Sequence, residues 1–143
     1  MTALRDWQFW AALVAAPIFW ALLYGLGSAP VDAVWPLAQP VRFLLPALIY
    51  PVLEEIVFRG GLQPWIARQP WGAHRVAGIS YANALTSVLF SALHFLFHPP
   101  LWAALVLVPS LVFGYFRERH DSLASPIMLH VFYNAGYFWI FGV

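Results

Sequence analysis

The sequence of 143 residues contains no cysteine and no lysine, and only 9% of its residues are charged. Without cysteine the chain has no disulfide, no thiol nucleophile and no thiolate metal site. Without lysine, Lys-based catalysis is excluded and every cation is an arginine or a histidine. A soluble domain carries about 25% charged residues, whereas 62% of this chain is hydrophobic. Soluble enzymes, nucleic-acid binders and disordered tails are therefore excluded, and the lipid bilayer is the expected solvent.

Five apolar stretches approach the roughly 20 residues that a membrane-spanning helix requires. Loops rich in Gly, Pro or Arg separate these stretches, which cover residues 7–26, 41–58 (or on to 66), 79–97, 101–116 and 123–141. The predicted fold class is all-α, a polytopic integral membrane bundle of about five transmembrane helices. We expect a single membrane-embedded domain over residues 1–143, with the catalytic core at about 41–141 and an additional N-terminal helix at 7–26.

The arginines predict the orientation of the chain. With five spans, the N-terminus and the loops after the second and fourth spans share one side of the membrane. That side holds every arginine except Arg42, namely Arg5, Arg59, Arg68, Arg75, Arg117 and Arg119. The positive-inside rule then places the N-terminus in the cytoplasm and the C-terminus outside, and we expect a bacterial inner membrane. The first stretch could instead be a signal peptide cleaved near Gly27-Ser28-Ala29, but Pro30 disfavours that cut.

Ionisable residues inside membrane helices are costly and are therefore candidates for function. The second stretch carries Glu54, Glu55 and Arg59. Glu55 and Arg59 are four residues apart, so we interpret them as a structural ion pair on one helix face. Glu54 lies about 100° around the helix, and its neighbour one turn on is Phe58, which provides no charge partner. A carboxyl in such surroundings is suited to act as a general base near neutrality.

The third stretch carries a polar stripe at helical spacing, made of Ser80, Asn83, Ser87, Ser91 and His94. Small polar residues allow helices to approach closely in lipid, so this face is predicted to point into the bundle. Phe90 precedes His94 by one turn and is placed to hold the imidazole ring.

The fifth stretch places His130 and Asn134 four residues apart on one helix face. An imidazole N–H beside an amide NH₂ can donate to a developing oxyanion. The structural alternative for His130 and Asn134 is a hydrogen bond between helices, and for His94 it is a packing contact. Glu54 with these three side chains provides no covalent nucleophile. The set therefore favours an activated water that hydrolyses a peptide bond inside the membrane. On the residues alone, a metal ion held by Glu54, His94 and His130 is a second option.

The remaining polar residues are interpreted more simply. We interpret three carboxylates as solvated loop charges, namely Asp32, Glu118 and Asp121. We interpret His98 as a residue at the membrane interface. Pro46 and Pro51 lie inside the second stretch and predict a distortion of the helix near the Glu pair.

Three motifs occur in order on successive apolar stretches: Glu-Glu-x-x-x-Arg at residues 54–59, Phe-x-x-x-His at 90–94 and His-x-x-x-Asn at 130–134. Together they resemble the CAAX protease and bacteriocin-processing (CPBP) family of glutamic intramembrane proteases, which includes the type II CAAX prenyl endopeptidases. The resemblance covers about residues 51–134.

This resemblance implies a role for each motif residue. Glu54 would activate water with the help of His94, and His130 and Asn134 would form the oxyanion site. Glu55 and Arg59 would be supporting residues. No metal or other cofactor is expected, because the family is regarded as metal-independent.

The resemblance also bears on the substrate. Full-length prenyl endopeptidases have more spans than the five expected here, so the chain looks like a minimal core. Small bacterial members resemble sorting peptidases of the JDVT-CTERM type. The expected partners are the lipid bilayer and a membrane-anchored protein or peptide, cut near a C-terminal processing or sorting signal.

Two functions without hydrolysis compete with this interpretation. The first is a membrane immunity or scaffold protein of the same family, in which the polar residues only specify helix packing. The second is a fragment of a proton-coupled transporter, which the lack of an inverted repeat disfavours.

Overall fold

The computed structural model describes residues 2–142, so the end residues of the predicted domain, Met1 and Val143, lie outside the described residues. The fold is mostly helical, as the composition predicted. The elements are, in chain order, the 3₁₀ turn η1 (Ala3–Arg5), α1 (Trp7–Gly25), α2 (Trp35–Ala38), α3 (Pro40–Leu44), the π-helical segment η2 (Leu45–Ile49), α4 (Tyr50–Glu55), the π-helical segment η3 (Ile56–Leu62), α5 (Gln63–Ala67), β1 (Arg75–Val76), β2 (Ile79–Ser80), α6 (Tyr81–His94), α7 (Pro100–Leu105), α8 (Leu107–His120) and α9 (Ala124–Phe141).

The chain forms two compact units. Unit 1 contains residues 2–53 and 127–142, which include α1, η2 and most of α9. Unit 2 contains residues 54–126, which include η3, the two strands and helices α5 to α8.

Within residues 2–142, two helical stretches are long and apolar enough to cross a membrane, Trp7–Gly25 with 19 residues and Pro100–His120 with 21 residues. They coincide with the first and fourth apolar stretches of the sequence. Along α1 the buried residues are Phe9 and Ala16, and large apolar side chains such as Leu22 are exposed. A helix that is apolar on all faces and largely uncovered requires an apolar surrounding, which a bilayer supplies.

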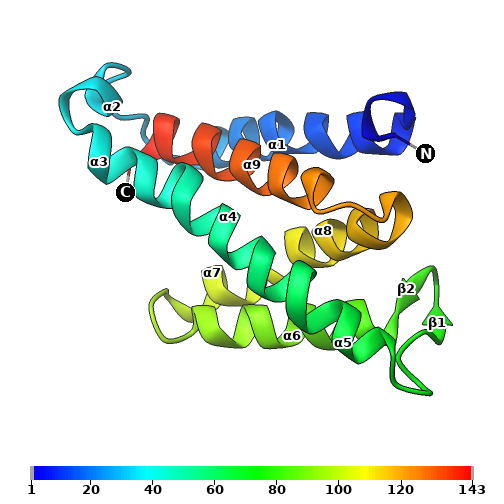
Figure 1. The fold of residues 1–143 in the computed structure, drawn as a ribbon. Coiled ribbons are helices and arrows are strands. Elements are labelled where there is room, and N and C mark those ends of the chain that lie inside the picture. The colour runs from blue at the N-terminus through cyan, green and yellow to red at the C-terminus, as the bar shows by residue number, and fades with distance from the viewer. Residues whose placement is uncertain (1, 143) are drawn as a thin grey trace. The chain divides into compact units, whose positions relative to one another are not determined.

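In unit 1, helix α9 lies alongside α1 (Figure 1). The Tyr133 hydroxyl donates to the Ala12 carbonyl at 2.7 Å. Gly136 is required at the crossing, because a Cβ there would lie 2.0 Å from the Trp20 ring. At the other end of α9, the Trp35 indole donates to the Trp139 carbonyl at 3.0 Å. Together, these contacts hold α9 against both α1 and the segment that carries α2.

In unit 2, the polar face of α6 packs against α8, as the stripe predicted. The Asn83 amide donates to the Leu111 carbonyl at 2.9 Å. A Cβ on Gly114 would lie 2.0 Å from Asn83 Oδ1, so the two helices approach closely at a residue without a side chain. Ser91 extends the contact by donating to the Ala103 carbonyl on α7 at 2.6 Å. Small and polar side chains are typical of such close contacts in membrane proteins.

The third helix starts later than the predicted residue 79, because Ile79 and Ser80 pair with Arg75 and Val76 in an antiparallel hairpin. In Figure 1 this hairpin follows α5 in the chain and projects beyond the end of α5. Its turn uses Ala77 and Gly78 at φ of +50° and +85°, the left-handed geometry of tight two-residue hairpins. Ser80 ends the strand and caps α6, since its hydroxyl accepts from the Asn83 N–H at 2.9 Å.

Glu118 is not the solvated loop charge that we predicted. Its side chain is only 17% exposed and lies near the C-terminal end of α8. It pairs with Arg75 of the hairpin at 2.7 Å, and it accepts hydrogen bonds from Gln63 at 2.8 Å and from the Ser80 hydroxyl. A carboxylate with several strong donors can be buried at low cost. Glu118 therefore joins α5, the hairpin and α8.

Candidate active site

The candidate base lies on a continuous helical run over residues 40–67, in which η2 and η3 are π-helical. Each π segment is followed two residues later by a proline, Pro51 after η2 and Pro64 after η3. A proline inside an α-helix clashes with the carbonyl four residues earlier, and an added residue in the turn relieves that clash. The distortion predicted from Pro46 and Pro51 therefore takes the form of a π-helical segment. Glu54 and Glu55 end α4, directly before η3.

Glu55 and Arg59 form the predicted ion pair, with Arg59 Nη1 at 3.0 Å from Glu55 Oε1 and both side chains completely buried. The guanidinium also donates to the Ser110 carbonyl at 2.9 Å and to the Ser110 hydroxyl. It lies over the Phe90 ring at 4.7 Å. A buried charge needs a partner and further hydrogen bonds to offset its desolvation, and Arg59 obtains them from α4 and α8.

Glu54 is half-buried at the end of α4. The Arg59 guanidinium is within electrostatic range of its carboxylate.

His94 ends α6, and its ring orientation is set by Phe90 as predicted. The ring centroids are 4.6 Å apart, and His94 Nδ1 lies 2.8 Å from the Phe90 carbonyl. A carbonyl can only accept, so Nδ1 carries a proton and donates it to this contact. The His98 ring stacks on His94 with centroids 5.5 Å apart, a contact that the sequence interpretation missed.

His130 and Asn134 both lie on α9 in unit 1, four residues apart. His130 is buried, and Asn134 is half-buried. Asn134 Nδ2 donates to the Pro46 carbonyl in η2 at 3.0 Å. This carbonyl loses its usual helical donors, because the Tyr50 N–H goes to the Leu45 carbonyl and residue 51 is a proline. Asn134 thus makes the inter-helix hydrogen bond that was the structural alternative, and it retains a second N–H.

The predicted site residues are divided between the two units. Glu54, Glu55, Arg59 and His94 belong to unit 2, and His130 and Asn134 belong to unit 1. Within either unit, no three His, Asp or Glu side chains of the described residues gather closely enough to hold a metal ion.

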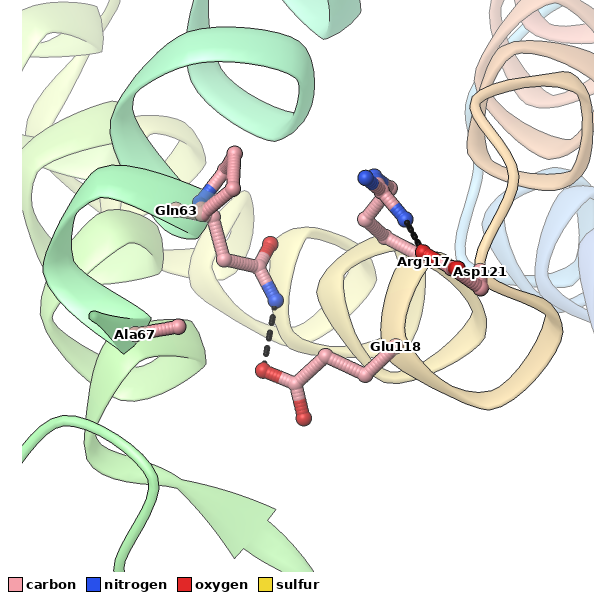
Figure 2. A pocket seen from close by; sticks show the side chains of 6 residues that line it. Gln63, Ala67, Arg117, Glu118 and Asp121 are labelled. Atoms are coloured by element: carbon pink, nitrogen blue, oxygen red, sulfur yellow. Dashed lines mark hydrogen bonds and ion pairs between the residues drawn. The ribbon is translucent and has the colours of Figure 1, made fainter.

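Unit 2 also contains a cavity of about 240 Å³ that the sequence did not reveal. It is lined by Gln63, Pro64, Ala67, Arg117, Glu118 and Asp121. Figure 2 shows the Gln63 amide pointing to the Glu118 carboxylate, and Arg117 directed to Asp121. Gln63 is only 1% exposed. The sequence gives no signal that distinguishes this buried glutamine from an exposed one. None of the predicted catalytic residues lines this cavity.

The model of the Rce1-like type II CAAX prenyl endopeptidase family matches residues 35–136. The chain belongs to this family. The match covers more than half of the chain and includes the segments of all three motifs. The comparisons with curated proteins and with solved structures give no significant match. Membership confirms the predicted family, and it supports a hydrolase of the CAAX protease type that is integral to a membrane. The family match does not favour the alternative of an immunity or scaffold protein.

Proposed function

We propose that this Rce1-like protein is a glutamic-type intramembrane endopeptidase that cuts a membrane-anchored protein or peptide. The observation that carries the proposal is the family match over residues 35–136, which contains Glu54, His94, His130 and Asn134. Glu54 directly precedes the buried Glu55–Arg59 ion pair, and the His94 ring is oriented by its contact with the Phe90 carbonyl. Both features suit residues that must take up a proton in a defined direction.

The proposed step is a hydrolysis without a covalent enzyme intermediate, metal or other cofactor. Glu54 takes a proton from water with the help of His94, and the water oxygen bonds to the peptide carbonyl carbon. His130 and the second N–H of Asn134 donate to the resulting oxyanion. Collapse of this intermediate breaks the C–N bond, and the proton held by the Glu54–His94 pair passes to the leaving amine.

We further propose that the protein is a single domain with about five spans in a bacterial inner membrane, N-terminus in the cytoplasm. Helices occupy each of the five apolar stretches, and the arginines are strongly biased to one side. By analogy with small sorting peptidases of this kind, the substrate is expected to be cut near a C-terminal processing or sorting signal.

The proposal is tested with the purified protein in liposomes that hold one of two membrane-anchored peptides. One peptide carries a prenylated C-terminal cysteine motif, and the other a transmembrane helix with a basic C-terminal end. Mass spectrometry should find two products from at least one peptide with wild type, also in the presence of chelator, and none with His94→Ala. Cleavage that His94→Ala retains would contradict the assigned site. Failure of wild type to cut either peptide, in liposomes where it is correctly inserted, would contradict the proposed function.

The role of Asn134 can be separated from its contact with Pro46. Asn134→Ala should lower kcat on the order of 10²–10³-fold, the usual cost of losing one oxyanion donor. Adding Pro51→Ala gives residue 51 an N–H that can satisfy the Pro46 carbonyl within the helix. We expect the double variant to remain as slow as Asn134→Ala and Pro51→Ala alone to match wild type. Recovery of activity in the double variant would instead make Asn134 a residue that only supports η2.

A further inference from the structure

The Arg59 carbonyl in η3 loses both of its usual helical hydrogen-bond donors. In an α-helix the donor would be the Gln63 N–H, but this group goes to the Phe58 carbonyl. In a π-helix the donor would be the N–H of residue 64, and that residue is Pro64. An unsatisfied carbonyl inside a membrane protein is costly, so a donor from elsewhere is required.

Arg117 on α8 supplies that donor. Its Nε–H donates to the Arg59 carbonyl at 3.1 Å. The other end of the guanidinium pairs with Asp121 at 2.9 Å, and Figure 2 shows this pair among the residues that line the cavity. The Arg117 side chain is 20% exposed, whereas Asp121 is 94% exposed. The hydrogen bond to Arg59 is therefore on the protected side of Arg117, and the ion pair is on the solvated side.

Helix α8 thus holds Arg59 at two points. Ser110 accepts from the Arg59 guanidinium, and Arg117, seven residues later on the same helix face, donates to the Arg59 carbonyl. Arg59 in turn holds Glu55 by the buried ion pair. Within unit 2, Glu54 and Glu55 directly precede η3, so the support of this segment bears on the residues that carry the candidate base.

The same arrangement occurs independently in unit 1. There the Pro46 carbonyl lacks its donors because of the Tyr50–Leu45 hydrogen bond and Pro51, and Asn134 supplies the donor. Two π segments, each followed by a proline, are each completed by one side chain from another helix. In both segments the side-chain donor is needed because a proline lacks the N–H. The donor itself differs, since it is Asn134 in one segment and Arg117 in the other.

We propose that Arg117 is a positioning residue for the Glu54 site, acting through the Arg59 backbone. The inference rests on the proposed function, because it assigns Arg117 to the same reaction. A simpler interpretation is that Arg117 is only one of the arginines that orient the chain in the membrane. In that case the effect of replacing Arg117 would not depend on residue 64.

Four variants test the inference: Arg117→Ala, Pro64→Ala, the double variant, and Asp121→Asn as the matched control. Asp121→Asn removes the ion pair with Arg117 and leaves the hydrogen bond to Arg59, and asparagine tolerates the left-handed φ of +47° at this position. Pro64→Ala provides an N–H at residue 64 that can reach the Arg59 carbonyl within the helix.

Arg117→Ala should lower kcat on the order of 10–100-fold with KM unchanged, since a small displacement of a catalytic group has this cost. The double variant should recover most of the loss, and Pro64→Ala and Asp121→Asn should match wild type. Full activity of Arg117→Ala, or a double variant as slow as Arg117→Ala, would overturn the inference.

Amide hydrogen exchange over residues 56–62, measured without substrate, distinguishes failure of this inference from failure of the proposed function. Exchange should accelerate in Arg117→Ala, return to the wild-type rate in the double variant, and stay unchanged in Asp121→Asn. If wild type cuts no substrate but this pattern appears, the proposed function has failed and the support of η3 by Arg117 stands. If the pattern is absent, the inference has failed whatever the activity.

Discussion

Glu54→Gln should lower the rate of peptide cleavage on the order of 10²–10⁴-fold, the range that a general base contributes. Glutamine keeps the size and hydrogen-bonding reach of the side chain but cannot take a proton from water. The expected loss is in kcat, because a water-activating group acts on the chemical step and not on substrate binding. The measurement is product formation in liposomes, with substrate in excess.

The control for this experiment is Asp32→Asn, which removes one carboxylate from an exposed loop and should leave cleavage unchanged. Both variants should insert and unfold like wild type, so that a difference between them reports on chemistry. If Glu54→Gln retains full activity, the assignment of Glu54 as the base is wrong. Glu55→Gln is less informative, because it leaves the buried Arg59 without its carboxylate partner and so changes stability as well.

Arg59→Met should destabilise the protein by about 3–5 kcal/mol, because it leaves the Glu55 carboxylate buried without its cation. It also removes the donor to Ser110 and the contact over the Phe90 ring. Combining Arg59→Met with Glu55→Leu should recover much of the loss, since two apolar side chains avoid the desolvation that the lone carboxylate suffers. The measurement is reversible unfolding in mixed micelles, with helicity as the signal.

The matched control is Arg119→Met on α8, where the arginine is exposed and its guanidinium hydrogen-bonds the Tyr115 hydroxyl at 3.2 Å. An exposed arginine of this kind contributes about 0–1 kcal/mol, so the free energy of unfolding should change little. If Arg59→Met were no more destabilising than Arg119→Met, the pair would not stabilise unit 2. A double variant as unstable as Arg59→Met would show that Arg59 acts chiefly through Ser110.

Much of the helical structure was predictable because apolar length and helical spacing are local properties. The helix at residues 7–26 differs from α1 by a single residue, and the buried polar stripe of α6 follows from spacing alone. The Glu55–Arg59 pair was predictable for the same reason, since residues four apart on a helix are neighbours. The hairpin before α6 was missed, because two-residue strands leave no periodic signal in the sequence.

The sequence by itself determined that the chain needs an apolar surrounding and carries three family motifs, because composition and spacing depend on no distant contact. Only the tertiary structure decided how the prolines are accommodated. It converts the turns before Pro51 and Pro64 into π-helical segments and completes them with Asn134 and Arg117. It also changes Glu118 from an expected surface charge into a largely buried acceptor. The physical reason is that a carbonyl or carboxylate removed from water must find its donor in space, and the donor's position along the chain leaves no mark on the sequence around the acceptor.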